Sequence, residues 1–238
     1  MTAGLIFDYG GTLDTGGQHW GQALWHAYER HCVPVTEAEF REAYVHAERM
    51  LGRNPVIGSA FTFRQTLETK IRLQLDFLET RCEGVKKYEQ ILLDDLYEKT
   101  LAETAHSRKV LAAIRERGLP MVLVSNFYGN MSVVLREFGF EGLFLRIIES
   151  AVVGIRKPDP RIFLMGVEAL GLKPEEVMVV GDSWDKDIIP AHEAGCQTVW
   201  LRDEGWNPHP LPVQKEEECR YCAVIDSLDE LLEMIKTK

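Results

Sequence analysis

Residues 4–14 read Gly-Leu-Ile-Phe-Asp-Tyr-Gly-Gly-Thr-Leu-Asp. The first four form a short apolar run of the kind found in fully buried β-strands, and the charged residue Asp8 follows directly. The two glycines at positions 10 and 11 then indicate a turn. A buried strand that ends in an acidic turn is typical of open parallel sheets, where ligands bind beyond the carboxyl ends of the strands.

Five further runs of β character occur along the chain, at residues 121–124, 145–148, 177–180, 198–201 and 223–225. Between the later runs, apolar residues recur every three or four positions, which indicates helices. Strands that alternate with helices predict a parallel sheet covered on both faces. The fold class is therefore α/β, with a doubly wound, Rossmann-like core.

The stretch from about residue 16 to 105 has a different pattern, since it contains no good strand candidate. Its apolar residues fall at helical intervals in four successive segments. We therefore expect residues 1–15 and 106–238 to form the catalytic core, and residues 16–105 to form an all-helical cap domain inserted after the first strand. Such a cap would close over the sheet, with hinges near residues 15–17 and around 104–107.

The composition excludes several classes of partner. The 238 residues carry 27 Lys and Arg against 37 Asp and Glu, a formal charge of −10, and an acidic surface repels nucleic acid and anionic lipid. No apolar run approaches the roughly 20 residues that cross a bilayer. The five cysteines are odd in number and scattered, so we expect a reduced, cytoplasmic protein. The sequence does not indicate an oligomeric state.

Cys219 and Cys222 have the spacing of a metal-binding pair. A structural zinc site needs four ligands, and the chain offers no second pair. His209 is a poor substitute, so we do not predict zinc here.

Polar side chains follow three of the predicted strands. Asp8 follows the first strand, Ser125 and Asn126 follow the second, and the fourth leads into an acidic loop that contains Asp182 and Asp187. Because the carboxyl ends of parallel strands share one edge of the sheet, these groups should converge on one crevice. The convergence would join residues that lie more than fifty positions apart in the sequence.

With these motifs in this order, the chain resembles the haloacid dehalogenase superfamily of hydrolases, in the form that carries a helical cap between the first two motifs. The resemblance covers nearly the whole chain and is weakest in the cap. It implies that Asp8 is the nucleophile and Ser125 the phosphate-binding hydroxyl. It also implies that Lys157, within Gly154-Ile-Arg-Lys-Pro-Asp159, is the lysine of the third motif, and that Asp182 and Asp187 are the carboxylates of the fourth.

The chemistry asks for these residue types. A carboxylate that attacks phosphorus in line forms an aspartyl-phosphate, which splits one difficult displacement into two easier ones. Mg²⁺ suppresses the charge repulsion by bridging the carboxylate and a phosphate oxygen, and a lysine neutralises the transferring group. The expected metal ligands are Asp8, Asp182, Asp187 and the backbone carbonyl of Gly10. The expected phosphate contacts are Ser125, Asn126, Lys157, Gly11 and Thr12, and the catalytic residues are Asp8, Lys157 and Ser125.

Gly10 departs from the family pattern. Most hydrolases of this family carry an aspartate two residues after the nucleophile, and that aspartate protonates the leaving group and then activates water. Three explanations are open. The substrate has a good leaving group, such as an acyl phosphate; another residue supplies the acid, with Asp14, His19 and His26 as candidates; or the protein has lost turnover and binds Mg²⁺ and phosphate in a sensing or interaction role. A phosphonate hydrolase is a further alternative that needs a cap lysine such as Lys70, which we expect to face solvent.

The sequence thus predicts slow phosphatase or phosphotransferase activity on a small phosphorylated metabolite. Carbon–halogen cleavage does not use the magnesium site, so the acidic loop argues against that reaction. We expect the cap to select the substrate through side chains that face Asp8; the candidates are His19, Trp20, Arg49, Arg53 and Arg64.

Overall fold

The computed structural model describes residues 2–53, 56–202 and 222–235. Its six strands form one parallel sheet in the order β3-β2-β1-β4-β5-β6. Each strand lies within one residue of a run expected from the sequence, so the predicted core sheet is confirmed. The strands are β1 (Gly4–Phe7), β2 (Met121–Ser125), β3 (Arg146–Glu149), β4 (Val177–Gly181), β5 (Gln197–Leu201) and β6 (Cys222–Ile225).

β1 occupies the middle of the sheet, between β2 and β4. Leu5 pairs with Met121 on one side and with Met178 on the other. All residues of these three strands are buried, which explains why they read as continuous apolar runs. The chain winds outward from β1 in both directions, so the carboxyl ends of β1 and β4 border the point where the connections diverge.

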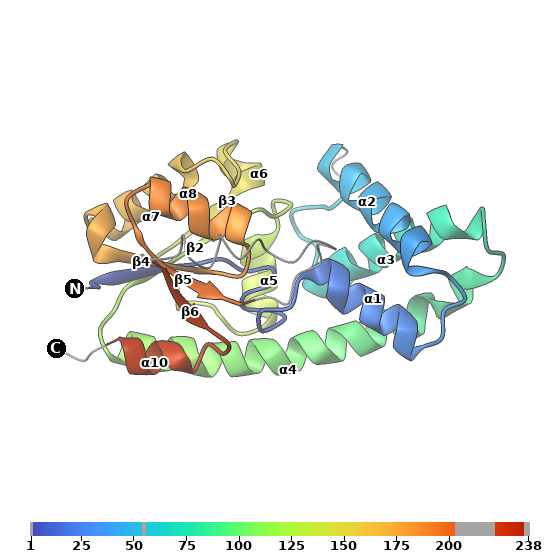
Figure 1. Cartoon of the computed structure of the whole chain (residues 1–238), viewed down its shortest axis with the longest axis horizontal. Helices are drawn as coiled ribbons and strands as arrows, with labels where there is room; N and C mark the ends of the chain where they lie inside the picture. Colours follow the sequence, from blue (N-terminus) through green and yellow to red (C-terminus); the bar gives the residue numbers. More distant parts are fainter. Residues whose placement is uncertain (1, 54–55, 203–221, 236–238) are drawn as a thin grey trace.

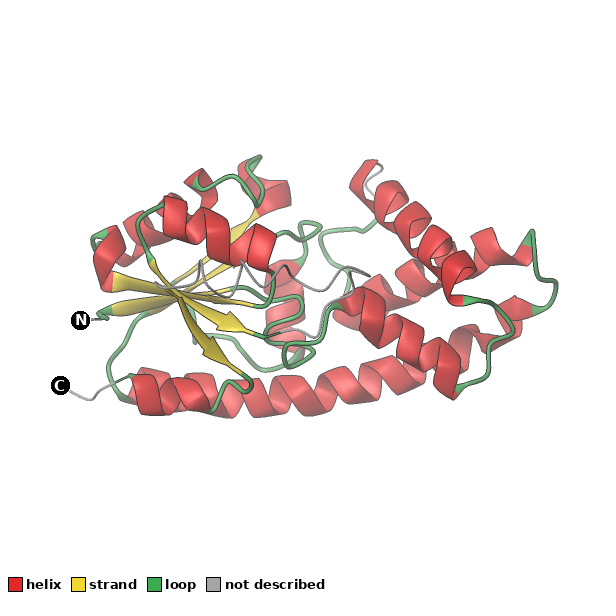
Figure 2. Cartoon of the chain, viewed as in Figure 1, coloured by secondary structure: helices red, strands yellow, loops and turns green. Residues whose placement is uncertain are grey.

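Helices cover both faces of the sheet (Figure 2). On one face, Ile162, Phe163 and Val167 of α7 pack against strand residues such as Ile6 and Val179. The opposite face belongs to a second apolar cluster, which continues into the cap. The helices that flank the sheet are α5 (Met131–Glu137), α6 (Ser150–Val153), α7 (Arg161–Leu170), α8 (Ile189–Glu193), α10 (Glu230–Met234) and the second half of α4 (Glu89–Glu116), with the short turns η2 (Pro174–Glu176) and η3 (Trp184–Ile188).

The described part of the inserted segment contains helices joined by turns and no strand. Its apolar stripe on α3, which includes Leu67, Ile71 and Leu75, is buried as its period predicts. Thr62 caps this helix, and the Gln65 side chain returns to the Thr62 backbone to complete a capping box. The cap elements are α1 (Trp20–Arg30), α2 (Glu37–Arg53), α3 (Phe63–Glu79), η1 (Val85–Tyr88) and the first half of α4.

Helix α4 crosses the boundary that the sequence placed at residue 105. It runs unbroken from Glu89 to Glu116, and Figure 1 shows it extending beneath both the bundle and the sheet. The second hinge expected around residues 104–107 is therefore wrong. The reason is local, because residues 101–107 contain neither glycine nor proline and nothing there ends a helix.

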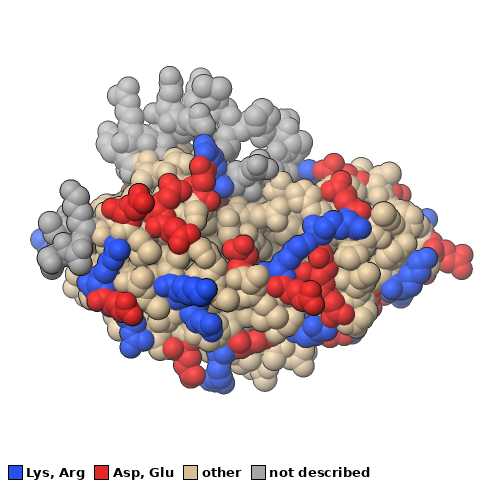
Figure 3. Space-filling model, turned by 90° about the horizontal axis from the view of Figure 1, so that it is seen from below, with Lys and Arg blue, Asp and Glu red and all other residues tan. Residues whose placement is uncertain are grey.

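Charged side chains of both signs are interspersed on the face seen from below, as Figure 3 shows. That mixture follows from the composition, in which basic residues are numerous although acidic ones exceed them. Among the described helices, none combines the length and the apolar character needed to span a bilayer. The expected lack of a nucleic-acid partner stays a prediction.

Two core side chains hold the first turn of cap helix α3. The carboxylate of Glu137, in α5, accepts hydrogen bonds from the backbone N–H groups of Phe63 and Arg64 and from the Tyr97 hydroxyl. The side-chain amide of Asn130 donates to the Phe61 carbonyl and to the Thr66 hydroxyl, both at 2.9 Å. A carboxylate at a helix N-terminus satisfies donors that the helix itself leaves unpaired. The cap is thus fastened to the core at α3.

Replacing Glu137 with alanine should lower the free energy of unfolding by about 1–3 kcal/mol, because the donors at the start of α3 lose their acceptor. Urea unfolding of the metal-free protein measures the change. Glu141→Ala is the matched control, since that side chain is 74% exposed and its ion pair with Arg136 is long, at 3.7 Å. The control should shift stability by less than about 0.5 kcal/mol. Equal losses in the two variants would contradict the role given to Glu137.

Candidate active site

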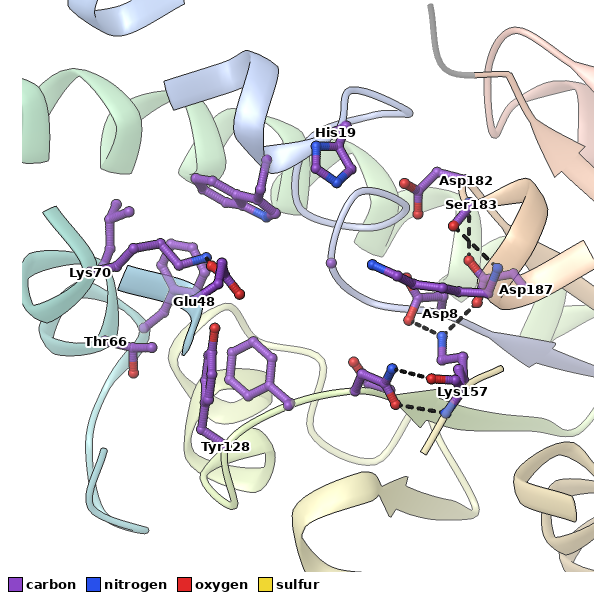
Figure 4. Close-up of a pocket in the computed structure, with 18 of the residues that line it drawn as sticks. Asp8, His19, Glu48, Thr66, Lys70, Tyr128, Lys157, Asp182, Ser183 and Asp187 are labelled. Atoms are coloured by element: carbon purple, nitrogen blue, oxygen red, sulfur yellow. Dashed lines mark hydrogen bonds and ion pairs between the residues drawn. The ribbon is translucent and has the colours of Figure 1, made fainter. Parts of the chain in front are cut away.

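Asp8 lies directly beyond the end of β1. Its backbone N–H donates to the Val180 carbonyl at 3.0 Å, so the chain follows the sheet for one residue more and then turns. The side chain is buried, and in Figure 4 it points into a cavity at the carboxyl edge of the sheet. Ser125, Asp182 and Lys157 line the same cavity, so the convergence expected from the strand ends is present in the structure.

Three buried carboxylates gather here. Asp8, Asp182 and Asp187 each offer an oxygen, and these oxygens lie within 4.8 Å of one another. One cation is shared between two of them, because the Lys157 ammonium donates to Asp8 at 2.5 Å and to Asp187 at 2.6 Å. The second oxygen of Asp187 accepts from the Ser183 backbone N–H at 3.0 Å. With all three carboxylates ionised, the single ammonium would leave an excess of two negative charges.

The pKa values respond to this crowding. Burial raises the pKa of Asp8 to about 6, although Lys157 acts in the opposite direction. Burial, with the charges of Asp187 and Asp8, raises the pKa of Asp182 well above its usual value. Burial alone would lower the pKa of Lys157, but the two carboxylates raise it, so the lysine stays charged. A divalent cation among these oxygens would remove the excess charge, and the donor set suits a hard ion such as Mg²⁺.

Thr12 and Gly11 hold Asp182 in place. The Thr12 hydroxyl donates to the Asp182 carboxylate at 3.0 Å and accepts from the Asp182 backbone N–H at 3.1 Å. Gly11 has φ +101°, and a Cβ there would lie 2.3 Å from an oxygen of Asp182, so only glycine allows this approach. The Gly11 N–H is bonded to Asp14, and neither Gly11 nor Thr12 lines the cavity. Their predicted contact with phosphate stays a prediction.

Asn126 positions Lys157. Its side-chain amide donates to the Lys157 carbonyl at 3.0 Å, and its side-chain oxygen accepts from the Lys157 N–H at 2.9 Å. Two such bonds fix the backbone from which the Lys157 ammonium reaches Asp8. Ser125 is buried, and both residues line the cavity where the sequence placed a phosphate site.

The cap completes the cavity, which has a volume of about 150 Å³. His19 and Trp20 line it, as expected from the sequence. The other cap candidates lie elsewhere: Arg64 pairs with Asp94 at 2.6 Å, and Arg49 lines a separate groove. The side chain of Arg53 lies outside the described residues.

Further polar residues line the cavity, among them Tyr44, Glu48, Lys70 and Tyr128, and of these four the sequence analysis named only Lys70 as a candidate. Lys70 contradicts our expectation of a solvent-facing side chain, because it is only 12% exposed and its ammonium pairs with Glu48 at 2.6 Å. The sequence did contain a signal that could have identified Lys70 as a cavity residue. It is a charged residue within an apolar stripe, because it lies between Leu67 and Ile71 on the buried side of α3.

None of the three replacement acids is well placed for catalysis. His26 bonds to Gln18 and, like Asp14, lines a different cavity. The carboxylate of Asp14 accepts from the Gly11 N–H at 2.7 Å and from the Trp20 indole N–H at 2.9 Å. His19 does face the active cavity, but burial lowers its pKa to about 4, so the imidazole is neutral at pH 7.

The cysteine pair is only partly described. Cys222 begins β6 and is half-buried, whereas Cys219 and His209 lie outside the described residues. Asp8, Asp182 and Asp187 form the metal-type cluster found among the described side chains. The absence of zinc at the cysteines stays a prediction.

Comparison with known families agrees with this geometry. A family model described as haloacid dehalogenase-like hydrolase matches residues 2–195. The chain belongs to this family. The sheet topology, the acidic loop after β4 and the helical insertion all occur where the resemblance implied, so the predicted Rossmann-like α/β fold is confirmed.

Individual relatives of this hydrolase match it in part. It is 40% identical over 99 residues to a phosphoserine phosphatase of Thermus thermophilus, a match that covers 41% of this chain and 39% of the relative. It is 37% identical over 93 residues to a glyceraldehyde 3-phosphate phosphatase of Methanopyrus kandleri, covering 39% and 40% of the two chains. The chain thus matches about two-fifths of the length of each of these relatives.

A solved structure agrees over the whole length. A dehalogenase crystallised with an intermediate complex superposes with a TM-score of 0.65 and covers 100% of this hydrolase and 98% of that chain. The sequence identity is 18%, so the comparison shows the fold alone.

The stability of the metal-free hydrolase should reveal the titration of Asp14. Burial raises its pKa from 3.8 to about 7, so the folded state binds more protons between these values, and the contribution of this carboxyl to stability falls as the pH rises through that range. Asp14→Asn should therefore gain roughly 2–3 kcal/mol relative to wild type between pH 5 and pH 8 in urea unfolding with EDTA. Asp159→Asn, at a half-buried carboxyl whose pKa is lowered by Arg161, should show no such trend. A flat difference for Asp14→Asn would exclude the raised pKa.

Proposed function

We propose that this chain is a Mg²⁺-dependent phosphatase that hydrolyses a small phosphorylated metabolite through an aspartyl-phosphate on Asp8. One observation carries the proposal: a buried nucleophile shares Lys157 with Asp187 and lies beside Asp182, in a cavity that also contains Ser125. A divalent cation would relieve the excess negative charge of that arrangement, so that an anionic substrate could then approach Lys157. The phosphatase names of the two relatives support the same class of reaction.

The reaction proceeds in two displacements. A carboxylate oxygen of Asp8 attacks phosphorus, the bond between phosphorus and the leaving oxygen breaks, and that oxygen takes a proton. Water then attacks the phosphorus of the aspartyl-phosphate, releases inorganic phosphate and loses a proton, and Asp8 is regenerated. When bound, Mg²⁺ lowers the repulsion between the carboxylate and the phosphate. Asp8, Asp182 and the Gly10 carbonyl would hold it, with Asp187 as a partner of Lys157.

Lys157 and Ser125 act on the phosphoryl group. The lysine remains charged and already touches Asp8, so its ammonium can neutralise charge on the equatorial phosphate oxygens. The Ser125 hydroxyl, at the end of β2, is placed to donate to another of these oxygens. Asn126 holds the lysine during both displacements.

The absence of a positioned acid restricts the leaving group. Asp14 and His26 lie in another cavity, and His19 is neutral at pH 7. A leaving oxygen that needs little protonation, as in an acyl phosphate, therefore fits the site better than an alkoxide. This favours slow turnover or good leaving groups over complete loss of catalysis, because the nucleophile, lysine and metal ligands are in place.

The phosphonate-hydrolase alternative is disfavoured by Lys70. A Schiff base requires a neutral amine, which normally means a lysine of lowered pKa. Burial does act in that direction, but the carboxylate of Glu48 outweighs it and raises the pKa of Lys70 well above its usual value. The cap lysine is thus held as an ammonium.

Asp8→Asn should reduce the Mg²⁺-dependent release of phosphate from acetyl phosphate and p-nitrophenyl phosphate on the order of a thousandfold or more, because the nucleophile is lost. EDTA should abolish the wild-type reaction, and Mg²⁺ should restore it. Asp185→Asn is the control. Asp185 lies in the acidic loop between Asp182 and Asp187 but is exposed, so this substitution should leave the rate unchanged. Metal-independent turnover, or full activity without Asp8, would refute the proposal.

Gly10→Asp should restore general acid catalysis. A Cβ at Gly10 has only the Trp20 ring nearby, at 3.9 Å, so a side chain fits. The rate on alkyl phosphates should rise about a hundredfold, within the usual range for general acids, and the rate on p-nitrophenyl phosphate should change little. Gly10→Asn, with the same shape but no titratable group, should give no gain. Similar effects on both kinds of substrate would exclude the missing-acid explanation.

A further inference from the structure

The wall of the cavity that faces Asp8 comes from the cap and contains an ion pair. Glu48, on α2, and Lys70, on α3, pair at 2.6 Å with side chains that are 36% and 12% exposed. Figure 4 shows both groups across the cavity from Asp8 and Lys157. The Lys70 ammonium also lies 5.7 Å from the centre of the Tyr44 ring and 6.0 Å from that of Trp20.

This cap wall has no net charge at neutral pH. Of the described cap residues that line the cavity, Glu48 and Lys70 alone are ionised, and their charges cancel. His19 is neutral because burial lowers its pKa to about 4, and burial raises the pKa of Tyr44 and of Tyr128, the core-loop tyrosine beside this wall. Lys186, an exposed cation, lines the cavity from the core side, and its charge also acts on Glu48 and His19.

A neutral wall of this kind discriminates by charge. A carboxylate on the leaving group would meet Glu48, and an ammonium would meet Lys70, so either would break the ion pair or remain partly unpaired in a buried place. A hydroxyl both donates and accepts, so it can bond to Glu48, Lys70 and the tyrosine hydroxyls without separating the two charges. The Trp20 ring offers an apolar face for the carbons between such hydroxyls.

We infer that the Glu48–Lys70 pair selects an uncharged, hydroxyl-rich leaving group, so that the substrate is the phosphate of a short polyol or sugar. The inference rests on the proposed phosphatase function. The volume of about 150 Å³ is close to that of a cavity that holds benzene, so it suits a leaving group of a few carbons.

The same class satisfies the constraint at Gly10 when the phosphate sits on the hemiacetal carbon of a sugar. A hemiacetal hydroxyl is a stronger acid than an ordinary alcohol, so its oxygen leaves more readily without a proton donor.

Binding tests the inference separately from catalysis. Isothermal titration of the Asp8→Asn protein with Mg²⁺ should show that glycerol 3-phosphate and ribose 1-phosphate bind at least about tenfold more tightly than 2-phosphoglycolate and O-phosphoserine, a difference of about 1.4 kcal/mol. Tighter binding of either charged ligand would overturn the inference. If wild type hydrolyses none of the four while the binding order holds, the proposed function fails and the selectivity stands.

A second variant reverses the expected preference. Glu48→Gln leaves Lys70 without its counter-charge, so 2-phosphoglycolate should bind about tenfold more tightly than before, and glycerol 3-phosphate more weakly. A merely damaged cap would weaken both ligands alike. Asp76→Asn is the control, because it removes the acid of a 2.6 Å ion pair with Lys86 on the exposed cap surface and should leave both affinities unchanged. An unaltered ratio in Glu48→Gln would overturn the inference.

Discussion

The contact of one ammonium with two carboxylates organises this protein. Lys157 reaches Asp8 and Asp187 in a crevice where Asp182 adds a third acid, and all four side chains are buried. Without the lysine, three acids would share a space of low polarity with no cation, and the folded state would bear the cost of their desolvation. Much of the surrounding structure serves this contact: β1 and β4 deliver the acids, Asn126 fixes the lysine backbone, and Thr12 with Gly11 leaves room for Asp182.

The sequence predicted the sheet well and the cap side chains poorly, for a physical reason. A buried parallel strand is apolar on both faces, so the six runs are visible without knowledge of what packs on them. A cap helix has one buried stripe, and its period says which residues are inside but not whether the inside is core or ligand cavity. Lys70 lies in such a stripe, and its pairing with Glu48 depends on a second helix more than twenty residues away in sequence. The requirement for glycine at position 11 has the same origin, because it is set by Asp182, which is distant in the chain.

Three of the candidate site residues could be brought together from the sequence because each follows a strand end, where topology alone brings residues together. Asp8, Ser125 and Asp182 needed no knowledge of side-chain packing. The candidate acids could not be assessed without knowledge of side-chain packing. Asp14 and His26 are near Asp8 in sequence, yet both line another cavity, and the carboxylate of Asp14 accepts a hydrogen bond from the Trp20 indole. Proximity along the chain is thus a weak guide where a loop turns between two cavities.

The unbroken helix α4 has a mechanical consequence. A cap joined to its core by two flexible loops can tilt or slide in many directions, but this one is carried on a stiff rod of 28 residues whose far half is embedded beneath the sheet. If such a helix tilts relative to the core, the displacement of the cap residues it carries grows with their distance from the core. Any tilt of this helix would therefore displace the tip of the bundle around η1 most and the walls next to Asp8 least.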